Sequence, residues 1–256
     1  MGKNKLAKFA RMEELPNVLQ YPYGRLRDEG FPYRGRWREF FGNDNPIVLE
    51  LGCGKGEYAV GMAALQPDRN FVGIDIKGAR MYTGATAAHE AGQTNVAFLR
   101  TSIELLDSFF APGEVAEIWI TFPDPQMRKV NKRLTGTRLT ALYRRVAGAD
   151  GIVNLKTDSP FLYAYTRLMA ADNGLEVLAD TDDLHGTGRG AMVDDLRQIL
   201  THYERQWLGR GLTIKYLRYR LGDGPLAEPA GADDIADDTY RSYSRGYIQM
   251  PQMLDK

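Results

Sequence analysis

The segment IVLELGCGKGEYAVGMAALQPDRNFVGIDIKGAR, residues 47–80, decides the fold of this 256-residue chain. It holds two short apolar runs, at 47–51 and 71–75, separated by a glycine-rich turn and a helical pattern. Two strands joined through a helix form a βαβ unit, in which the strands are parallel. We therefore expect an α/β fold built on a parallel sheet.

The same alternation continues toward the C-terminus. Further apolar runs predict strands at 96–100, 116–121 and 151–157, and two more runs follow at 175–180 and 212–221. Helical patterns occupy 56–65, 78–91, 103–110, 137–146, 161–171 and the region near 194–208. We expect a mostly parallel seven-stranded sheet with helices on both faces. The last run, LTIKYLRYRL, alternates in the manner of an antiparallel or edge strand.

Length and composition fit one globular domain with terminal additions. Hydrophobic residues make up 43% of the chain and charged residues 26%, as in ordinary soluble proteins. No apolar run approaches the ~20 residues of a membrane-spanning helix, and the N-terminus lacks a secretory signal. The single cysteine excludes an intrachain disulfide and favours a cytoplasmic location. We expect a basic extension over 1–42, the main domain over 43–221, and an acidic extension over 222–256 whose packing is open.

Charge is distributed unevenly, although the formal net charge is zero. Residues 126–145 hold seven basic side chains and no acid, whereas residues 221–239 hold six acids and no base. This polarity favours one face for a polyanion and another that stays solvated. Solvated basic helices are also common, so charge clustering alone leaves both interpretations open.

The turn after the first strand, GCGKG at 52–56, predicts a cofactor site. Glycines let the backbone bend sharply and let a ligand approach the main chain. Dinucleotide-binding turns follow G-x-G-x-x-G, with the pyrophosphate at the helix N-terminus. Here Glu57 stands at the third glycine position, and its carboxylate would repel a pyrophosphate. NAD and FAD are therefore disfavoured, and Gly52, Gly54 and Gly56 are expected to bind another cofactor.

Two acids point to S-adenosylmethionine. Glu50 precedes the turn and complements the ammonium and sulfonium groups directly or through water, and Asp75 ends the next strand, where an acid accepts both ribose hydroxyls. Thr101 and Ser102 end the third strand near the expected adenine, where either hydroxyl contacts the base or caps the next helix; capping suits Ser102 better. Cys53 is expected to fill the turn and not to act as a nucleophile, and no residues show metal-ligand spacing.

The strand at 116–121 runs into FPDP at 122–125. The two prolines fix the backbone and hold Asp124 at the carboxyl edge of the sheet, where ligands bind in open α/β folds. A rigid acid there suits a nucleic-acid base presented to a methyl donor, and an ordinary Asp-Pro turn is the alternative. The basic loop behind it is expected to contact phosphates, which fix position without reading sequence, through Arg128, Lys129, Lys132 and Arg133.

Two later segments place polar side chains at the same edge. The fifth strand ends in KTDSP, which contains Asp158. Thr201, His202, Tyr203 and Glu204 lie on the helix expected near 194–208, where Thr201 and Glu204 share one face at i, i+3 spacing. His202 by itself is expected to be a surface residue.

In order along the chain, LELGCGKG, GIDIKGAR, the FPDP turn with its basic loop, LKTDSPFLYAY and THYERQWLGRG resemble the bacterial tRNA (guanine-N7)-methyltransferases. The resemblance covers roughly residues 48–220. It implies a Rossmann-like class I methyltransferase fold over 43–221. It also implies transfer of a methyl group from S-adenosylmethionine to N7 of guanine 46 in the tRNA variable loop, with S-adenosylhomocysteine as the second product. The site residues it implies are Glu50, Asp75 and Asp124 for the donor, and Arg128, Asp158 and 201–204 for tRNA.

Three positions depart from the family's pattern. Gln126 stands where the family often has tryptophan, and Arg128 replaces its usual lysine in a loop two residues shorter. Thr101 stands where an acid usually ends the third strand. The first two changes affect guanine docking, and the third affects adenine binding. The sequence leaves open whether the protein is a monomer or a homodimer.

The chemistry expected at the site is positional and electrostatic. N7 of guanine carries a lone pair and no proton, so its attack on the methyl group needs alignment and no general base. The product guanine is cationic, and a nearby carboxylate stabilises that charge. Asp124 is the expected catalytic residue. Two other functions stay open: a small-molecule methyltransferase of the same fold, and a non-enzymatic RNA-binding module with a vestigial donor pocket.

Overall fold

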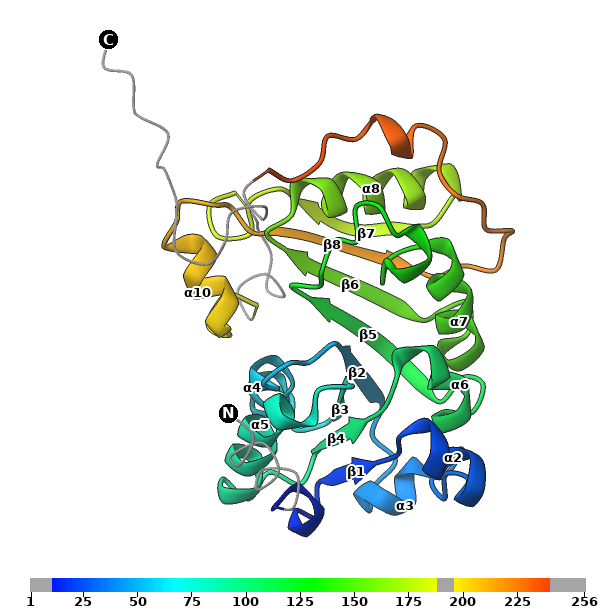
Figure 1. Cartoon of the computed structure of the whole chain (residues 1–256), viewed down its shortest axis with the longest axis vertical. Helices are drawn as coiled ribbons and strands as arrows, with labels where there is room; N and C mark the ends of the chain where they lie inside the picture. The colour runs from blue at the N-terminus through cyan, green and yellow to red at the C-terminus, as the bar shows by residue number, and fades with distance from the viewer. Residues whose placement is uncertain (1–10, 188–195, 240–256) are drawn as a thin grey trace.

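The structure is a computed structural model that describes residues 11–187 and 196–239. Its sheet has eight strands in the order β1-β4-β3-β2-β5-β6-β8-β7 (Figure 1). Only β8 runs antiparallel to its neighbours, so the predicted mostly parallel α/β sheet is confirmed. The strands are β1 (Val18–Gln20), β2 (Ile47–Leu51), β3 (Asn70–Asp75), β4 (Val96–Arg100), β5 (Val115–Thr121), β6 (Ile152–Thr157), β7 (Val177–Thr181) and β8 (Lys215–Arg220).

All seven predicted strands are present, and β1 is an additional one. It pairs in parallel with β4, from Val18 beside Phe98 to Gln20 beside Arg100. A three-residue strand is too short to give a period-2 pattern, which is why the sequence did not reveal it. The sheet therefore begins inside the segment that was expected to be an extension.

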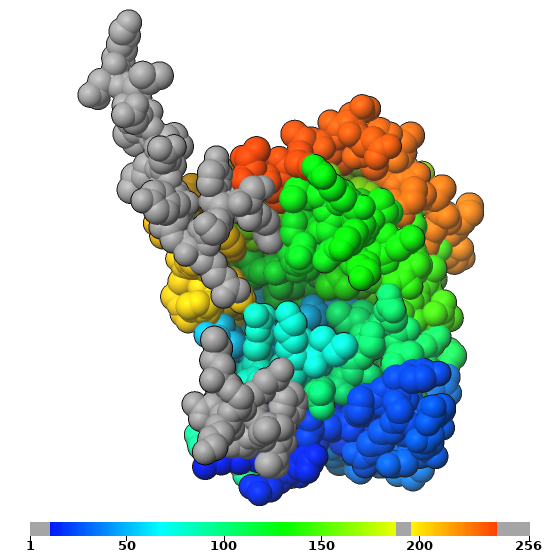
Figure 2. All heavy atoms as spheres, viewed as in Figure 1, coloured from blue at the N-terminus to red at the C-terminus, as the bar shows by residue number. Residues whose placement is uncertain are grey.

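Residues 11–42 are part of the folded body, which corrects the prediction that they form an appendage. Helices α2 (Tyr23–Glu29) and α3 (Trp37–Phe41) follow β1. Trp37 is fully buried, donates from Nε1 to the carbonyl of Phe109 at 3.0 Å and stacks on Phe110. In the space-filling view this segment (blue) forms the lower part of the body (Figure 2).

Helices cover both faces of the sheet, as predicted. One face packs α4 (Glu57–Leu65), α5 (Gly78–Glu90) and the region before α10 (His202–Leu208), and the other packs α6 (Leu106–Phe109), α7 (Thr137–Ala147) and α8 (Pro160–Asp172). Successive residues of a strand point to opposite faces of the sheet. Val48 packs in the core that contains α4 and α5, and Leu49 packs in the core that contains α6, α7 and α8. Continuous apolar runs follow from burial on both sides.

The single helix expected near 194–208 is interrupted. Residues 196–198 are helical, and the chain then leaves the helix before α10 starts at His202. Thr201 is the N-cap, and its hydroxyl accepts a hydrogen bond from the Glu204 amide at 3.2 Å. A threonine there therefore begins a new helix. The start of the expected helix, the first ten residues and the closing YRSYSRGYIQM lie outside the described residues.

The acidic segment packs back onto the domain as far as residue 239. Glu228 accepts from Thr137 and, at 2.7 Å, from the hydroxyl of Tyr165. Asp238 is buried and accepts from the backbone amide of Phe161 at 3.0 Å. This segment (orange) runs over the top of the body in Figure 2.

The strand order reverses between β2 and β5, with β3 on one side and β6 on the other. The carboxyl ends of the parallel strands share one edge of the sheet, and α10 lies at the side to which the β5 and β6 arrows point (Figure 1). Ligands of open α/β sheets bind at such a switch point. Among the described residues, no helix has both the length and the apolar character needed to cross a membrane.

Candidate active site

The glycine turn divides into an open part and a packed part. Gly52, Gly54 and Gly56 all have positive φ values, 76°, 57° and 73°. A Cβ atom added at Gly52 or Gly54 would meet no atom closer than 3.9 Å, whereas at Gly56 it would lie 2.3 Å from the ring of Phe98. Gly52 and Gly54 therefore leave the backbone accessible to a ligand, and Gly56 is required for packing.

Asp75 lies at the end of β3 beside this turn. Its carboxylate accepts from the amide of Gly54 at 3.0 Å and from the amide of Lys77 at 2.8 Å. The next side chain, Ile76, is 65% exposed. A fixed acid beside an exposed apolar side chain fits the ribose hydroxyls and the base of an adenosine. Ile76 could not be assigned from the sequence, because one apolar residue after a strand gives no distinctive pattern.

The two hydroxyls at the end of β4 have different outcomes: the contact of Thr101 with adenine stays a prediction, whereas the structure contradicts the role of Ser102. Thr101 is buried, and its Oγ1 has no hydrogen-bond partner among residues 11–187 and 196–239. Ser102 occupies the N-cap position of the short helical turn Ile103–Leu105, but its side chain makes no capping bond. The predicted capping role of Ser102 is therefore wrong; the backbone carbonyl of Ser102 accepts from Leu105 instead.

Glu50 links the two central strands beneath the turn. Its Oε1 accepts from the hydroxyl of Thr121 at 2.7 Å, and its Oε2 accepts from the amide of Ala59 at 2.9 Å. Burial raises the pKa of Glu50 to about 7. The carboxylate is only 3% exposed, so it holds the strand ends and α4 together directly below the donor turn.

Cys53 is buried in the same turn. Burial raises the pKa of its thiol well above the ordinary value, so the thiolate needed for nucleophilic attack is disfavoured. The described residues contain no group of three or more His, Cys, Asp or Glu side chains arranged to hold a metal ion.

Asp124 projects from a constrained turn. It is exposed, and its Oδ1 accepts from the amide of Gln126 at 3.1 Å. Phe122 and Gln126 have φ values of 48° and 50°, in the left-handed region that residues other than glycine rarely adopt. The amide of Phe122 donates to the carbonyl of Lys156 at 2.8 Å, which anchors the turn to β6. Strained backbone of this kind concentrates at functional sites.

A groove of about 640 Å³ opens beside Asp124. One of its walls is the start of the basic loop, and the other is the end of the acidic segment. Acidic and basic side chains therefore face the same space. This arrangement suits a ligand that carries both negative charge and N–H donors. Its lining residues are Asp124, Gln126, Met127, Arg128, Lys129, Asp237, Asp238 and Thr239.

Three of the four basic residues that were predicted to contact phosphates are exposed, and their contact with tRNA stays a prediction. Arg128, Lys129 and Lys132 are exposed, and the Arg128 guanidinium lies 4.0 Å from Asp237. Arg133 is buried, which contradicts the predicted phosphate contact. Its guanidinium donates to the carbonyls of 125–127 and lies 3.9 Å from the ring centroid of Tyr165. It stabilises the loop from within, because a desolvated cation needs such acceptors.

The segment 201–204 has the predicted two-sided arrangement. Thr201 and Glu204 are buried, whereas His202 and Tyr203 are exposed. The expectation that His202 lies on the surface is confirmed. Asp158, at the end of β6, is also buried, and its contact with substrate stays a prediction.

Two residues that the sequence analysis missed surround Glu204. Lys156 is fully buried, and its Nζ lies 2.9 Å from Glu204 Oε1. His185 Nε2 lies 2.8 Å from the same oxygen. A lysine inside an apolar strand was the available signal, since lysine is rarely buried without a partner.

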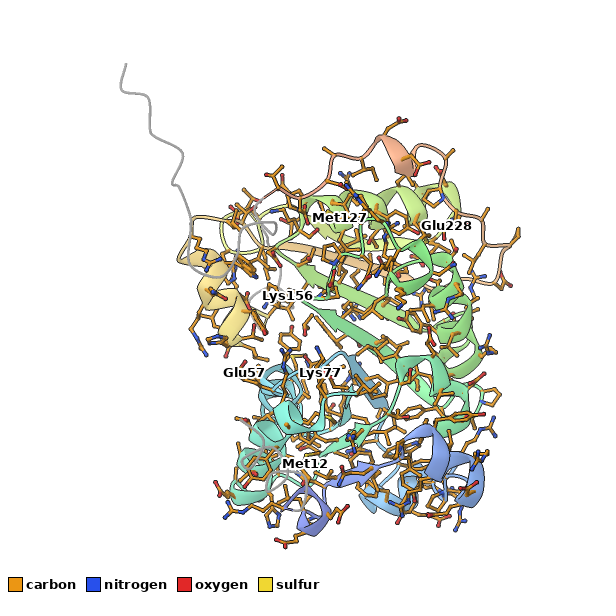
Figure 3. The ribbon with its side chains drawn as sticks, viewed as in Figure 1. Met12, Glu57, Lys77, Met127, Lys156 and Glu228 are labelled. Atoms are coloured by element: carbon orange, nitrogen blue, oxygen red, sulfur yellow. The ribbon has the colours of Figure 1, made fainter. Side chains whose placement is uncertain are left out.

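Glu57 was also missed as a site residue. Its Oε2 accepts from the amide of His202 at 3.0 Å, and its Oε1 lies 3.5 Å from Arg205. The first residue of α4 therefore holds the start of α10. Figure 3 shows Glu57, Lys77 and Lys156 around the same edge of the sheet.

The comparisons with known proteins agree with this geometry. A family model described as "Putative methyltransferase" matches residues 44–217. A tRNA (guanine-N(7)-)-methyltransferase of Bacteroides fragilis is 54% identical over 247 residues, covering 96% of each chain. One of Porphyromonas gingivalis is 58% identical over 238 residues, covering 91% of this chain and 96% of its own. The solved 16S rRNA methyltransferase KamB matches in fold, with a TM-score of 0.55 at 14% identity over 74% of this chain and 94% of its own.

Proposed function

Because the chain belongs to the tRNA (guanine-N7)-methyltransferases, we propose that it methylates guanine 46 in the tRNA variable loop. It is an S-adenosylmethionine-dependent tRNA methyltransferase, with N7 of guanine as the acceptor atom. One observation carries the proposed site: the open glycine turn with Asp75, the Asp124 turn and the exposed basic loop all lie at one edge of the sheet.

The residues of the donor side fit S-adenosylmethionine. Asp75 accepts the ribose hydroxyls, Ile76 offers an apolar surface to the adenine, and the open backbone at Gly52 and Gly54 receives the amino-acid part. Thr101 contributes a buried hydroxyl that has no partner within the described residues. S-adenosylmethionine supplies an electrophilic methyl group on its sulfonium and leaves as S-adenosylhomocysteine.

Glu50 supports donor binding in two ways: its negative charge attracts the cationic donor, and its hydrogen bonds fix the glycine turn. Both of its oxygens already accept a hydrogen bond from the protein. The carboxylate lies beneath the place where the donor's ammonium and sulfonium bind, and a bound cation favours its ionised form. Donor binding and ionisation of Glu50 are therefore coupled.

Asp124 orients and stabilises the guanine. The N7 lone pair attacks without loss of a proton, so the protein's task is to align the two reactants. Positive charge develops on the purine as the N7–carbon bond forms, and the fixed carboxylate of Asp124 stabilises it. The proline-bounded turn keeps this carboxylate in place, so little reorganisation accompanies the step.

The exposed cations Arg128, Lys129 and Lys132 bind tRNA phosphates beside the site. The 201–204 segment and Asp158 form the guanine side of the site. A small-molecule acceptor is disfavoured, because it would need no exposed basic loop there and the relatives are named for tRNA. A vestigial, non-enzymatic module is disfavoured by the intact turn and Asp75.

The test is transfer from labelled S-adenosylmethionine to an unmodified tRNA transcript, followed by mass identification of the modified nucleoside. We expect 7-methylguanosine. A matched transcript with adenosine at position 46 should accept no label, and one with another loop guanosine replaced should accept as much as the parent. Undiminished labelling of the position-46 variant would refute the proposed position.

A further inference from the structure

The acidic segment, residues 222–239, runs along α8 from the end of that helix to its start (Figure 1). At the end of the helix, Asn173 exchanges two hydrogen bonds with the backbone of Ala227, at 2.7 and 2.9 Å. Midway along the helix, Glu228 accepts from the hydroxyl of Tyr165 at 2.7 Å. The contacts of the segment therefore follow the helix toward the groove beside Asp124.

Asp238 joins the start of α8 to the basic loop. It is only 5% exposed, and its carboxylate accepts from Ser159 Oγ at 2.5 Å and from the amide of Phe161 at 3.0 Å. The backbone amide of Asp238 donates to the sulfur of Met127 at 3.1 Å. One residue of the acidic segment therefore contacts both a helix of the core and the loop whose exposed cations are proposed to bind tRNA.

These contacts connect the two walls of the groove beside Asp124. Residues 126–129 form one wall, and residues 237–239 form the other. The hydrogen bond from the amide of Asp238 to Met127 runs from one wall to the other. The position of Asp238 therefore fixes how far the loop stands from the acidic segment.

We propose that Asp238 is a positioning residue for tRNA binding, which holds the basic loop against the start of α8 so that Arg128 and Lys129 meet the phosphates beside the target guanine. This inference rests on the proposed function. An exposed carboxylate beside that loop would repel phosphates, but Asp238 is buried and each of its oxygens accepts a hydrogen bond from the protein. A loop that is already held in its binding position loses less conformational freedom when the ligand arrives.

The competing explanation is that Asp238 only stabilises the fold by binding the first turn of α8. Asn173 provides the matched control, because it also makes two hydrogen bonds with the acidic segment, at the other end of α8. If the segment only adds stability, Asp238→Ala and Asn173→Ala should both lower the free energy of unfolding and both leave tRNA binding unchanged. If Asp238 positions the loop, only Asp238→Ala should weaken tRNA binding.

The experiment measures steady-state methyl transfer from S-adenosylmethionine to an unmodified tRNA transcript. Asp238→Ala should raise the KM for tRNA at least ~5-fold and leave kcat within about twofold, because the lost contacts serve binding and not the methyl-transfer step. The turn that carries Asp124 keeps its own anchor, the hydrogen bond from the amide of Phe122 to the carbonyl of Lys156 at 2.8 Å. Asn173→Ala should leave both constants within about twofold of wild type.

Two further variants separate position from charge and from folding. Asp238→Asn removes the charge but keeps an acceptor for the amide of Phe161, so its KM for tRNA should stay within about twofold of wild type. Met127→Leu, a substitution of similar volume, breaks the contact with the loop and leaves the start of α8 intact. It should raise the KM for tRNA in the same direction, even if Asp238→Ala does not fold.

An equal rise of the KM for tRNA in Asp238→Ala and Asn173→Ala would overturn the proposal, as would a wild-type KM in Asp238→Ala or, where that variant does not fold, in Met127→Leu. A rise in Asp238→Asn as large as in Asp238→Ala would overturn it too, because the charge and not the position of the loop would then matter. Failure of the proposed function would look different, since the wild-type protein would then form no 7-methylguanosine at position 46.

Discussion

At the scale of single residues, Asp124 owes its position to its neighbours in the chain. Proline lies on each side of it, and the flanking Phe122 and Gln126 adopt left-handed backbone conformations. Such conformations cost on the order of 1–3 kcal/mol each and persist only where the surroundings enforce them. The turn therefore lowers the stability of the fold while it holds one exposed carboxylate at the edge of the sheet.

Asp124→Asn tests what that carboxylate does. Asparagine can still accept from the Gln126 amide, so the turn should keep its shape while losing the charge. The single-turnover rate of methyl transfer should fall at least ~10-fold, equivalent to about 1.4 kcal/mol, with smaller changes in donor and tRNA affinity. A variant as fast as wild type would show that Asp124 only shapes the turn.

Glu50 gives a prediction about pH. Its pKa of about 7 lies above the ordinary value of 4.5, so the folded protein holds this proton more tightly than the unfolded chain. Its contribution to stability is therefore fully present below about pH 4.5 and is lost as pH rises through 7. Glu50→Gln cannot ionise and should gain about 1–3 kcal/mol relative to wild type between about pH 5 and pH 8. Denaturant unfolding at both pH values measures this difference, and a constant difference would contradict the assignment.

Local chemistry decided which site residues the sequence could predict. Gly52, Gly54 and Asp75 follow from the rules for a strand–turn–helix unit, and Asp124 follows from the two prolines beside it. Lys156 and His185 could not be assigned, because their contacts with Glu204 depend on how three segments come together. Side-chain partners of that kind are a property of the fold.

At the scale of elements, the basic loop combines exposed and buried cations. A run of like charges in the sequence cannot show that Arg133 turns inward over Tyr165 while Lys132 points outward. The same limit applies to the interruption before α10, which the Thr201 cap creates within a continuous helical pattern. Periodicity predicts that an element exists better than it predicts where the element ends.

Substitutions of exposed and buried cations in the basic loop should separate its effect on tRNA binding from its effect on stability. Lys129→Ala with Lys132→Ala should reduce the salt dependence of tRNA binding by about two units of slope, since each lost phosphate contact removes about one. Binding titrations at several salt concentrations measure the slope. Arg133→Met is the control: it should lower the free energy of unfolding by at least about 2 kcal/mol without changing the slope. Equal slopes in the double variant and wild type would place the loop away from tRNA.

At the scale of the whole molecule, the sheet extends beyond the predicted domain. Strand β1 lies beside β4, next to the donor side of the site, and Trp37 packs the segment that follows against Phe109 and Phe110. The parallel core, its switch point and its two faces were predictable, because apolar runs alternate regularly with helical patterns in that part of the sequence. The N-terminal part was not, because its aromatic residues carry neither helix nor strand periodicity.

Trp37→Ala tests whether this segment folds with the sheet. Removing a fully buried tryptophan should lower the free energy of unfolding by about 3–5 kcal/mol. If residues 11–42 belong to the same cooperative unit, denaturant unfolding should still show one transition, shifted to lower denaturant. An early transition confined to the aromatic fluorescence, with the main transition unchanged, would instead identify a separately folding appendage.

One modified substrate shows whether the methyl group goes to N7 of a tRNA guanine. A tRNA carrying 7-deazaguanosine at position 46 differs from the parent only in having a carbon at the acceptor position. We predict that it binds with unchanged affinity and accepts no methyl group in single-turnover assays with saturating donor, while the parent is fully converted. Methyl transfer to the 7-deaza tRNA at the parent's rate would show that the methyl group goes to an atom other than N7.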